Sequence, residues 1–238
     1  MKLDGSLIIM KKELRSYFYS PVAYIVIAAF LVLSGYLFFD TFFLFGRSEL
    51  RGFFELLPIT FSIFIPALTM RLFAEEKHSG SFEILMTLPV TTLEAVLGKF
   101  LGATAFVGIM LAPTLFYAIS VALVGSPDIG PIVGGYLGAL LLGATFAAIG
   151  IFASTFTKNQ IIALIVGVLA CFLLTLFGLD RFKMLMPSAL VGVVEYLSVS
   201  GHFHSIERGV VDSRDIVYFL SVIALALMGS VHVLDERR

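Results

Sequence analysis

Long charge-free apolar runs alternate with short charged segments along the whole chain. A helix needs about 20 apolar residues to cross a bilayer, and most of the runs reach that length. One of them, residues 56–70, does so only by including Phe53 and Phe54 before it or residues 72–74 after it. The pattern predicts six transmembrane helices in an all-α integral membrane protein. The six runs are residues 21–39, 56–70, 100–127, 129–157, 159–179 and 216–234.

Composition supports a membrane protein rather than a soluble domain. Of the 238 residues, 59% are hydrophobic and 14% charged, whereas soluble domains average about 25% charged residues. The net charge of -1 gives no argument for a nucleic-acid partner. Residues 1–20 lack a small-residue cleavage site after an apolar core, so we expect them to be retained. The single cysteine, Cys171, lies in an apolar run and is interpreted as a packing residue.

The basic residues predict the orientation. If the N-terminus is cytoplasmic, ten of the 16 Lys and Arg residues fall in inside segments, namely both termini, residues 71–99 and the turn at Lys158. Loops rich in Lys and Arg stay on the cytoplasmic side. The sequence therefore predicts cytoplasmic N- and C-termini, in a bacterial-type cytoplasmic (inner) membrane.

An amphipathic segment precedes the first apolar run. Residues 6–19 combine apolar side chains with Lys11, Lys12 and Arg15. Such a helix lies on a membrane face, with its basic residues toward anionic headgroups. Two interpretations stay open for residues 1–20: a lipid anchor, or an interfacial helix that docks a partner.

The most charged internal segment, residues 71–99, has helix-boundary signals. Gly80 is suited to end a first helix in the left-handed conformation. Residues 81–88 place Phe82, Leu85 and Met86 at helical spacing before Pro89. Thr91 and Glu94 form a capping-box pattern for the next helix. The short central helix either docks a partner protein or packs against its own chain.

Two other segments are informative. Residues 180–215 have an apolar middle that is too short to cross twice, which favours a re-entrant segment over a packed surface loop. Gly134, Gly138 and Gly143 in the fourth run, with Ala139, predict close helix packing. Proline should punctuate two of the other helices. These prolines are Pro58 and Pro66 in the second run and Pro113 in the third.

Candidate chemistry is sparse. Gly98-Lys99 is followed by Phe100, and position 93 is leucine, so the phosphate-binding pattern G-x-x-x-x-G-K-[ST] is not met there. Glu75-Glu76 is similar to the double glutamate of intramembrane CAAX-type metalloproteases, but Gly80 stands where those enzymes have arginine. An intramembrane metalloprotease-like enzyme is thus an alternative with a weak signal.

The remaining chemical candidates are two histidines and a few charges near the ends of spans. His202 and His204 make at most a weak metal pattern. A secondary transporter or channel is a further alternative, but its ion path normally carries ionisable residues inside the spans. Here Asp40, Glu55 and His232 lie near predicted span ends.

Three stretches resemble one family. MRLFAEEKHSGSFEILMTLPVTTLEAVLGKF, IGIFASTFTKNQIIA and HFHSIERGVVDSRDIVYF are similar to segments of ABC-2 type permeases, the membrane subunits of one class of ABC transporter. The resemblance follows the whole chain in order. It is nearest to the permease group of gliding motility and of copper-site maturation. The matching residues are Arg71, Glu75, Glu76, Gly80, Glu83, Leu85, Pro89, Gly98, Lys99, Gly150, Ser154, Gln160, Phe203, Gly209, Asp212, Arg214, Asp215 and Tyr218.

The resemblance implies one transmembrane permease domain over residues 1–238. Its cytoplasmic hairpin, residues 71–99, carries a coupling helix for a separate ABC ATPase, beside the N-terminal helix. Lys158, Asn159 and Gln160 make a second, smaller cytoplasmic contact, and the segment before the last span is re-entrant. The expected ATPase-coupling residues are Glu75, Glu76, Gly80, Phe82, Glu83, Leu85, Met86 and Pro89.

The implied function is coupling of ATP hydrolysis to export or to force transmission. This chain is expected to bind no cofactor and no metal and to catalyse no reaction, with ATP and Mg on the partner ATPase. Other expected partners are a second permease copy or homologue, an auxiliary periplasmic or membrane protein, and the lipid bilayer. The lever hypothesis is that the ATPase pulls residues 81–88, which Glu75, Glu76 and Glu83 orient.

Overall fold

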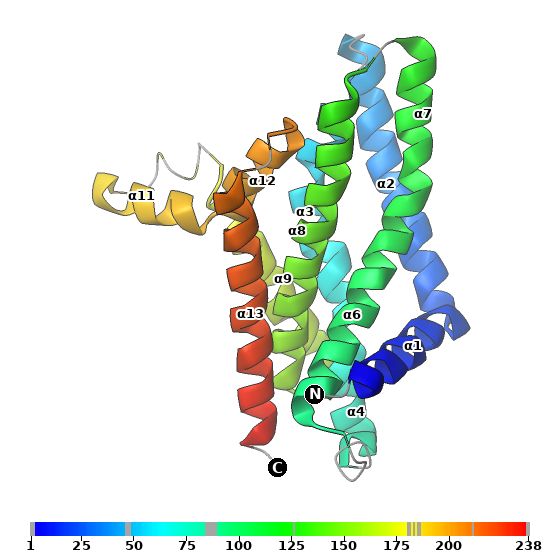
Figure 1. Ribbon diagram of the computed structural model, residues 1–238, viewed down its shortest axis with the longest axis vertical. Helices are drawn as coiled ribbons and strands as arrows, with labels where there is room; N and C mark the ends of the chain where they lie inside the picture. Colours follow the sequence, from blue (N-terminus) through cyan, green and yellow to red (C-terminus); the bar gives the residue numbers. More distant parts are fainter. Residues whose placement is uncertain are drawn as a thin grey trace.

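The protein is an elongated bundle of helices (Figure 1). The computed structural model describes residues 3–45, 49–83, 90–125, 127–179, 182, 184, 187–210 and 212–236, and the regular structure among them is entirely helical. The helices are α1 (Leu3–Tyr19), α2 (Pro21–Phe45), α3 (Arg51–Thr69), α4 (Arg71–Ser79), α6 (Thr92–Leu111), the 3₁₀ turn η1 (Ala112–Thr114), α7 (Leu115–Val124), α8 (Ile129–Thr155), α9 (Gln160–Leu176), α11 (Ser188–Leu197), α12 (Val199–Glu207) and α13 (Ser213–Asp235).

Five helical segments in the described part of the chain are long and apolar enough to cross a membrane. They are Pro21–Asp40, Arg51–Ser79, Thr92–Val124, Ile129–Thr155 and Ser213–Asp235. The predicted fifth span, residues 159–179, forms a helix of only 17 residues, α9. At 1.5 Å per residue α9 is about 25 Å long, shorter than the roughly 30 Å hydrocarbon core. The all-helical class is thus confirmed, whereas a count of six full-length spans is not.

The second and third spans are longer than the apolar runs that predicted them. Met70 joins α3 to α4 with helical backbone angles (φ -52, ψ -33), so the apolar run continues directly into the charged segment. In the third span Pro113 lies in η1, between α6 and α7. The predicted interruption at Pro113 is confirmed as a single turn of tighter helix.

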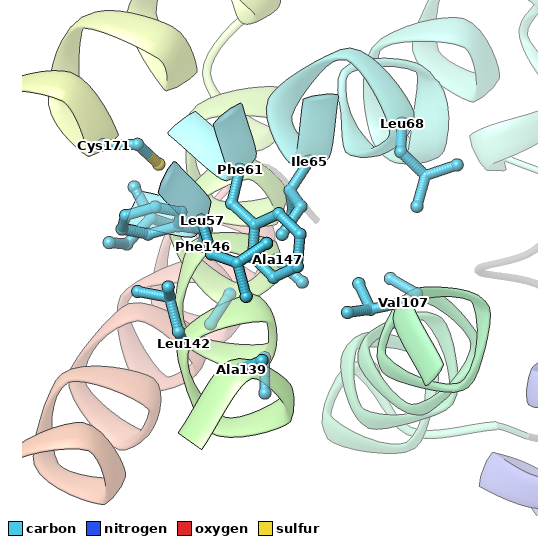
Figure 2. Close-up of a cluster of buried hydrophobic side chains, with 14 of the residues drawn as sticks. Leu57, Phe61, Ile65, Leu68, Val107, Ala139, Leu142, Phe146, Ala147 and Cys171 are labelled. Carbon is cyan, nitrogen blue, oxygen red and sulfur yellow. The ribbon is translucent and has the colours of Figure 1, made fainter. Parts of the chain in front are cut away.

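Helix α8 lies at the centre of the bundle. In the most apolar part of α8, 72% of residues are buried, compared with 33% in α2. Leu57, Phe61 and Ile65 of α3 pack on the side of α8 that carries Leu142 and Phe146 (Figure 2). Cys171 of α9 belongs to the same core and is fully buried, as predicted for a packing residue.

Small residues let these helices approach closely. A Cβ added at Gly143 would lie 2.5 Å from Cγ1 of Val107 in α6, and one added at Gly138 would lie 2.7 Å from Cγ2 of Ile206 in α12. Real Cβ atoms essentially never lie within 3.0 Å of such neighbouring atoms. The predicted close packing around the fourth apolar run is therefore confirmed.

Substituting Gly150 by alanine should destabilise the protein by about 1–3 kcal/mol, the usual effect of overpacking. A Cβ at Gly150 would lie 2.0 Å from Oγ1 of Thr69, whose hydroxyl donates to the carbonyl oxygen of Ile65. Gly130→Ala in the same helix is the matched control, because a Cβ there has nothing within 4 Å. Thermal unfolding in detergent measures both. Equal stability of the two variants would contradict this packing argument.

The two ends of the bundle differ in character. Helix α1 lies across one end of the bundle, where α4 and α13 also end, and we name this the α1 end (Figure 1). Helix α12 lies toward the other end, and α11 extends sideways from the bundle. Both chain ends thus approach the same end of the bundle as α4. Which end faces the cytoplasm, and whether residues 180–215 re-enter a membrane, stay predictions.

Candidate functional site: a charged joint at the α1 end

A buried lysine joins three helices at the α1 end. Lys99 of α6 has a side chain that is 1% exposed, and its Nζ donates to three acceptors. These are Oε1 of Glu13 in α1 at 3.0 Å, Oε1 of Glu76 in α4 at 2.7 Å and the carbonyl oxygen of Leu72 at 2.8 Å. The ammonium also lies 4.9 Å from the centre of the Phe73 ring. We call Glu13, Glu76 and Lys99 the charged joint.

Lys12 borders the joint from the solvent side. Its Nζ is 3.4 Å from Oε1 of both Glu13 and Glu76, while its side chain is 60% exposed. Burial acts to lower the pKa of Lys12, but the two carboxylates outweigh it and raise the pKa above its ordinary value. Lys12 therefore stays charged and screens the two glutamates from outside.

Tight backbone contact lets α1 reach this position. A Cβ at Gly98 would lie 2.7 Å from Cβ of Ile9 and 2.8 Å from the carbonyl oxygen of Ser6. Farther along α1, the Tyr17 hydroxyl is buried 3.4 Å from the carbonyl oxygen of Leu68, and the Arg71 guanidinium lies 4.6 Å from the Tyr17 ring centre. Burial raises the pKa of Tyr17. Helix α1 is thus anchored to α3, α4 and α6.

The predicted basic residues of α1 divide between two environments. Lys11 and Arg15 are exposed, whereas Lys12 reaches the joint. Together with Leu14 and Phe18 the three line a hollow of about 620 Å³. Leu7 and Ile8, on other positions of α1, expose 44% and 67% of their surface. The predicted amphipathic helix is therefore present, with its apolar and basic positions both accessible.

The predicted coupling residues also divide between two environments. Glu75 and Glu83 are exposed, and neither forms an ion pair with any residue that the structure describes. Glu76 instead faces Lys99 inside the joint. Phe82 is half-buried, with its ring centre 6.4 Å from that of Phe73 and 5.4 Å from Nζ of Lys77. Leu85, Met86 and Pro89 lie outside the described residues.

The boundary signals at Gly80 and at Thr91 with Glu94 are confirmed. Gly80 ends α4 in the left-handed conformation, with φ 75. The Thr91 hydroxyl accepts from the backbone N–H of Glu94 at 3.2 Å, and the Thr91 N–H donates to Oε2 of Glu94 at 2.9 Å. Next to this cap, the Thr92 hydroxyl donates to Oδ1 of Asp235 at 2.6 Å, which ties the start of α6 to the end of α13.

The second predicted contact lies beside the first. Lys77 of α4 is buried and donates to the carbonyl oxygen of Thr155 at the end of α8. The turn that follows holds Lys158 and Asn159, both exposed, and Gln160, which is half-buried. Oδ1 of Asn159 accepts from the N–H of Ile161 at 2.9 Å and so caps α9. The structure therefore brings the two predicted contact segments together.

The joint itself was missed by sequence reasoning. Glu13 and Lys99 are 86 positions apart, and no local pattern connects them. One signal was available in the sequence. Lys99 lies one helical turn before Gly102 and Ala103, so it places a charge on an otherwise apolar face of α6. Glu76 was predicted to face the ATPase, and its placement beside Lys99 gives it a second, internal role.

The described part of the chain holds no cluster of three candidate metal ligands around the histidines. His202 bonds Asp215, and His204 bonds Glu207. Burial, followed by the charge of Glu55, raises the pKa of Glu207 to about 7. Both histidines lie on α12, toward the other end of the bundle.

Several long apolar helices, with the charged joint at the α1 end, define a multi-pass helical membrane protein. The family model described as ABC-2 family transporter protein matches residues 7–195. The chain belongs to this family, whose members are the membrane components of ABC transporters. No curated protein matches the chain.

Proposed function

We propose that this protein is the permease subunit of an ATP-driven exporter, and that a separate ABC ATPase binds at the α1 end. The observation that carries the proposal is a rigid charged extension of a membrane helix. Helices α3 and α4 form one 29-residue segment, Arg51–Ser79. The exposed carboxylates of Glu75, in this segment, and of Glu83, just beyond Gly80, are available to basic residues of a partner.

The surroundings of α4 determine how a displacement would spread. Lys99 links α4 to α1 and α6, and Lys77 links it to the end of α8. A force on Glu75 of α4 therefore reaches three other helices, α1, α6 and α8, through hydrogen bonds of buried lysines. Because α3 packs on α8 at the bundle centre, movement of α4 would change the central helix packing. This is the lever hypothesis, with the bracing supplied by the joint.

The predicted membrane orientation and the ABC-2 family support three further parts of the proposal: the cytoplasmic face, a second ATPase contact and a second permease. The α1 end faces the cytoplasm, in an inner membrane of bacterial type, and the turn Lys158–Gln160 gives the ATPase a second contact. A second permease, identical or related, completes the transport path. Within the ABC-2 family, we propose the permease group of gliding motility and copper-site maturation as the subgroup of this chain. In that group, force transmitted to an auxiliary partner is the alternative to export.

Photo-crosslinking tests the proposed ATPase contact. A photoreactive residue at position 83 should capture an ATP-binding chain from native membranes, and the captured complex should hydrolyse ATP. The same residue at position 123, which is 83% exposed on α7 near the other end, is the control. Capture at position 123 alone, or a purified chain that cleaves peptides or conducts ions without a partner, would refute the proposal.

A further inference from the structure

A histidine lies between two hydrogen-bond acceptors where α11, α12 and α13 meet. Nδ1 of His202 is 2.7 Å from Oδ1 of Asp215, at the start of α13. Nε2 of the same ring is 3.0 Å from the carbonyl oxygen of Tyr196, at the end of α11. The ring also stacks on Tyr218, with centres 4.0 Å apart and planes at 20°.

Counting protons shows what this arrangement requires. A neutral imidazole has one N–H and an ionised carboxylate has none, so together they can satisfy only one of the two contacts. With one additional proton both contacts are hydrogen bonds. Either the imidazolium donates from both nitrogens, or the carboxylic acid donates to Nδ1 while Nε2–H donates to Tyr196.

We propose that His202 and Asp215 form a proton-binding site, and that the bound proton holds α11 against α12 and α13. The proposal goes beyond permease function and does not depend on it. A proton is the ligand, and the three-helix junction is the element that responds to it.

The end of α11 needs these contacts. The last carbonyl groups of a helix have no partner within the helix. Two carbonyl oxygens at the end of α11 accept hydrogen bonds from other helices. The carbonyl oxygen of Tyr196 accepts from His202, and that of Leu197 accepts from the Tyr218 hydroxyl at 2.6 Å. The negative end of the helix dipole also favours the protonated pair. Apart from this junction α11 extends sideways, with Leu190, Val193 and Tyr196 more than half exposed (Figure 1).

Loss of the proton weakens one of the two contacts. The remaining N–H stays toward the carboxylate, because a hydrogen bond to a charged acceptor is the stronger one. The Nε2 lone pair then faces the Tyr196 carbonyl oxygen, acceptor against acceptor. The attached state holds one proton more than the released state, so attachment is favoured at low pH and lost as pH rises.

Other charges near α12 do not replace this pair. Among the described residues, Asp215 and Tyr218 of α13 and Tyr196 of α11 contact His202. Glu195 of α11 borders a hollow with Gly201 and His204 of α12. Helices α8 and α9 carry no charged side chain. Arg51 and Glu55 of α3 are 3.2 Å apart and face Glu207, which pairs with His204 on the same helix as His202. Because burial raises the pKa of Glu207 to about 7, Glu207 could add to the pH dependence of α11 attachment, and the experiment needs a control for it.

Spin-label distances between α11 and α13 test the proposal on the full chain in nanodiscs. Labels on Val193→Cys and Val217→Cys, both exposed, report the position of α11, while the buried Cys171 stays unlabelled. Between about pH 5 and about pH 9, a range that brackets the usual imidazole pKa of about 6.5, the released population should rise about fivefold, which corresponds to one net hydrogen bond.

Two substitutions at the site should act in opposite directions. Asp215→Asn can donate from its amide to Nδ1 while Nε2–H donates to Tyr196, so α11 should stay attached at every pH. His202→Gln cannot bind the proton, so α11 should be released to the same extent at every pH. Tyr218→Phe should raise the released fraction and keep the pH dependence. Glu207→Gln and His204→Gln should keep it also.

The comparison of the two variants decides the matter. A purely structural role predicts that Asp215→Asn and His202→Gln both release α11, and that result would overturn the proposal. Loss of the pH dependence in Glu207→Gln, with its retention in His202→Gln, would overturn it as well.

Discussion

Replacement of Lys99 by methionine is expected to destabilise the protein by about 3–5 kcal/mol, the usual effect of removing one partner from a buried ion pair. Methionine fills a similar volume but donates no hydrogen bond. Glu13, Glu76 and the Leu72 carbonyl would lose the donor that all three share. Chemical denaturation in detergent micelles measures the loss.

Lys12→Met is the matched control for Lys99→Met. Lys12 lies 3.4 Å from the same two carboxylates but is mostly exposed, so its removal should change stability by less than about 1 kcal/mol. Adding Glu13→Gln and Glu76→Gln to Lys99→Met should restore part of the stability, because the unpaired charges are then gone. If Lys99→Met and Lys12→Met lost the same amount of stability, the charged joint would not be the anchor of α1.

The elements of residues 71–114 that follow local rules could be predicted. Gly80 permits a left-handed helix end, and Thr91 with Glu94 closes a capping box across three residues. Pro113 lacks a backbone donor and interrupts the third span. In each case the physical cause lies within one turn of the chain. The rule for proline is not sufficient everywhere, because Pro58 and Pro66, which should also interrupt their helix, lie inside the continuous α3.

The end of α9 shows where local reasoning fails. The apolar run continues to residue 179, yet α9 ends at Leu176. The Ser200 hydroxyl donates to the carbonyl oxygen of Thr175 at 3.0 Å, and a Cβ at Gly178 would lie 2.4 Å from the Ser198 hydroxyl. The start of α12 therefore occupies the space and the hydrogen-bonding groups that a longer helix would need. A hydropathy pattern carries no trace of that contact.

The candidate site divides in the same way. Surface carboxylates such as Glu75 and Glu83 could be named from the resemblance because they follow a short motif. The role of Lys99 depends on two partners, Glu13 and Glu76, from separate helices. A buried charge is too costly to leave unpaired, so a lysine inside an apolar face predicts partners but does not identify them.

Reversing the two exposed carboxylates, by Glu75→Lys with Glu83→Lys, is expected to weaken ATPase binding at least tenfold and to abolish the ATPase response to the permease. Neither side chain has an ion pair among the described residues, so protein stability should change by less than about 0.5 kcal/mol. Like charges placed face to face across an interface cost several kcal/mol. Affinity is measured by titrating purified ATPase onto the permease in nanodiscs.

The control reverses Glu49 and Asp128, two exposed carboxylates at the opposite end that border a cavity of about 710 Å³. Glu49→Lys with Asp128→Lys makes the same change in net charge. If only the Glu75 and Glu83 variant loses ATPase affinity, the loss reflects a direct contact rather than the net charge of the permease. Raising the salt concentration should reduce the difference between the two, because screening weakens exposed charge pairs. Unchanged ATPase affinity in the Glu75 and Glu83 variant would mean that these carboxylates do not meet the partner, and would contradict the proposed contact.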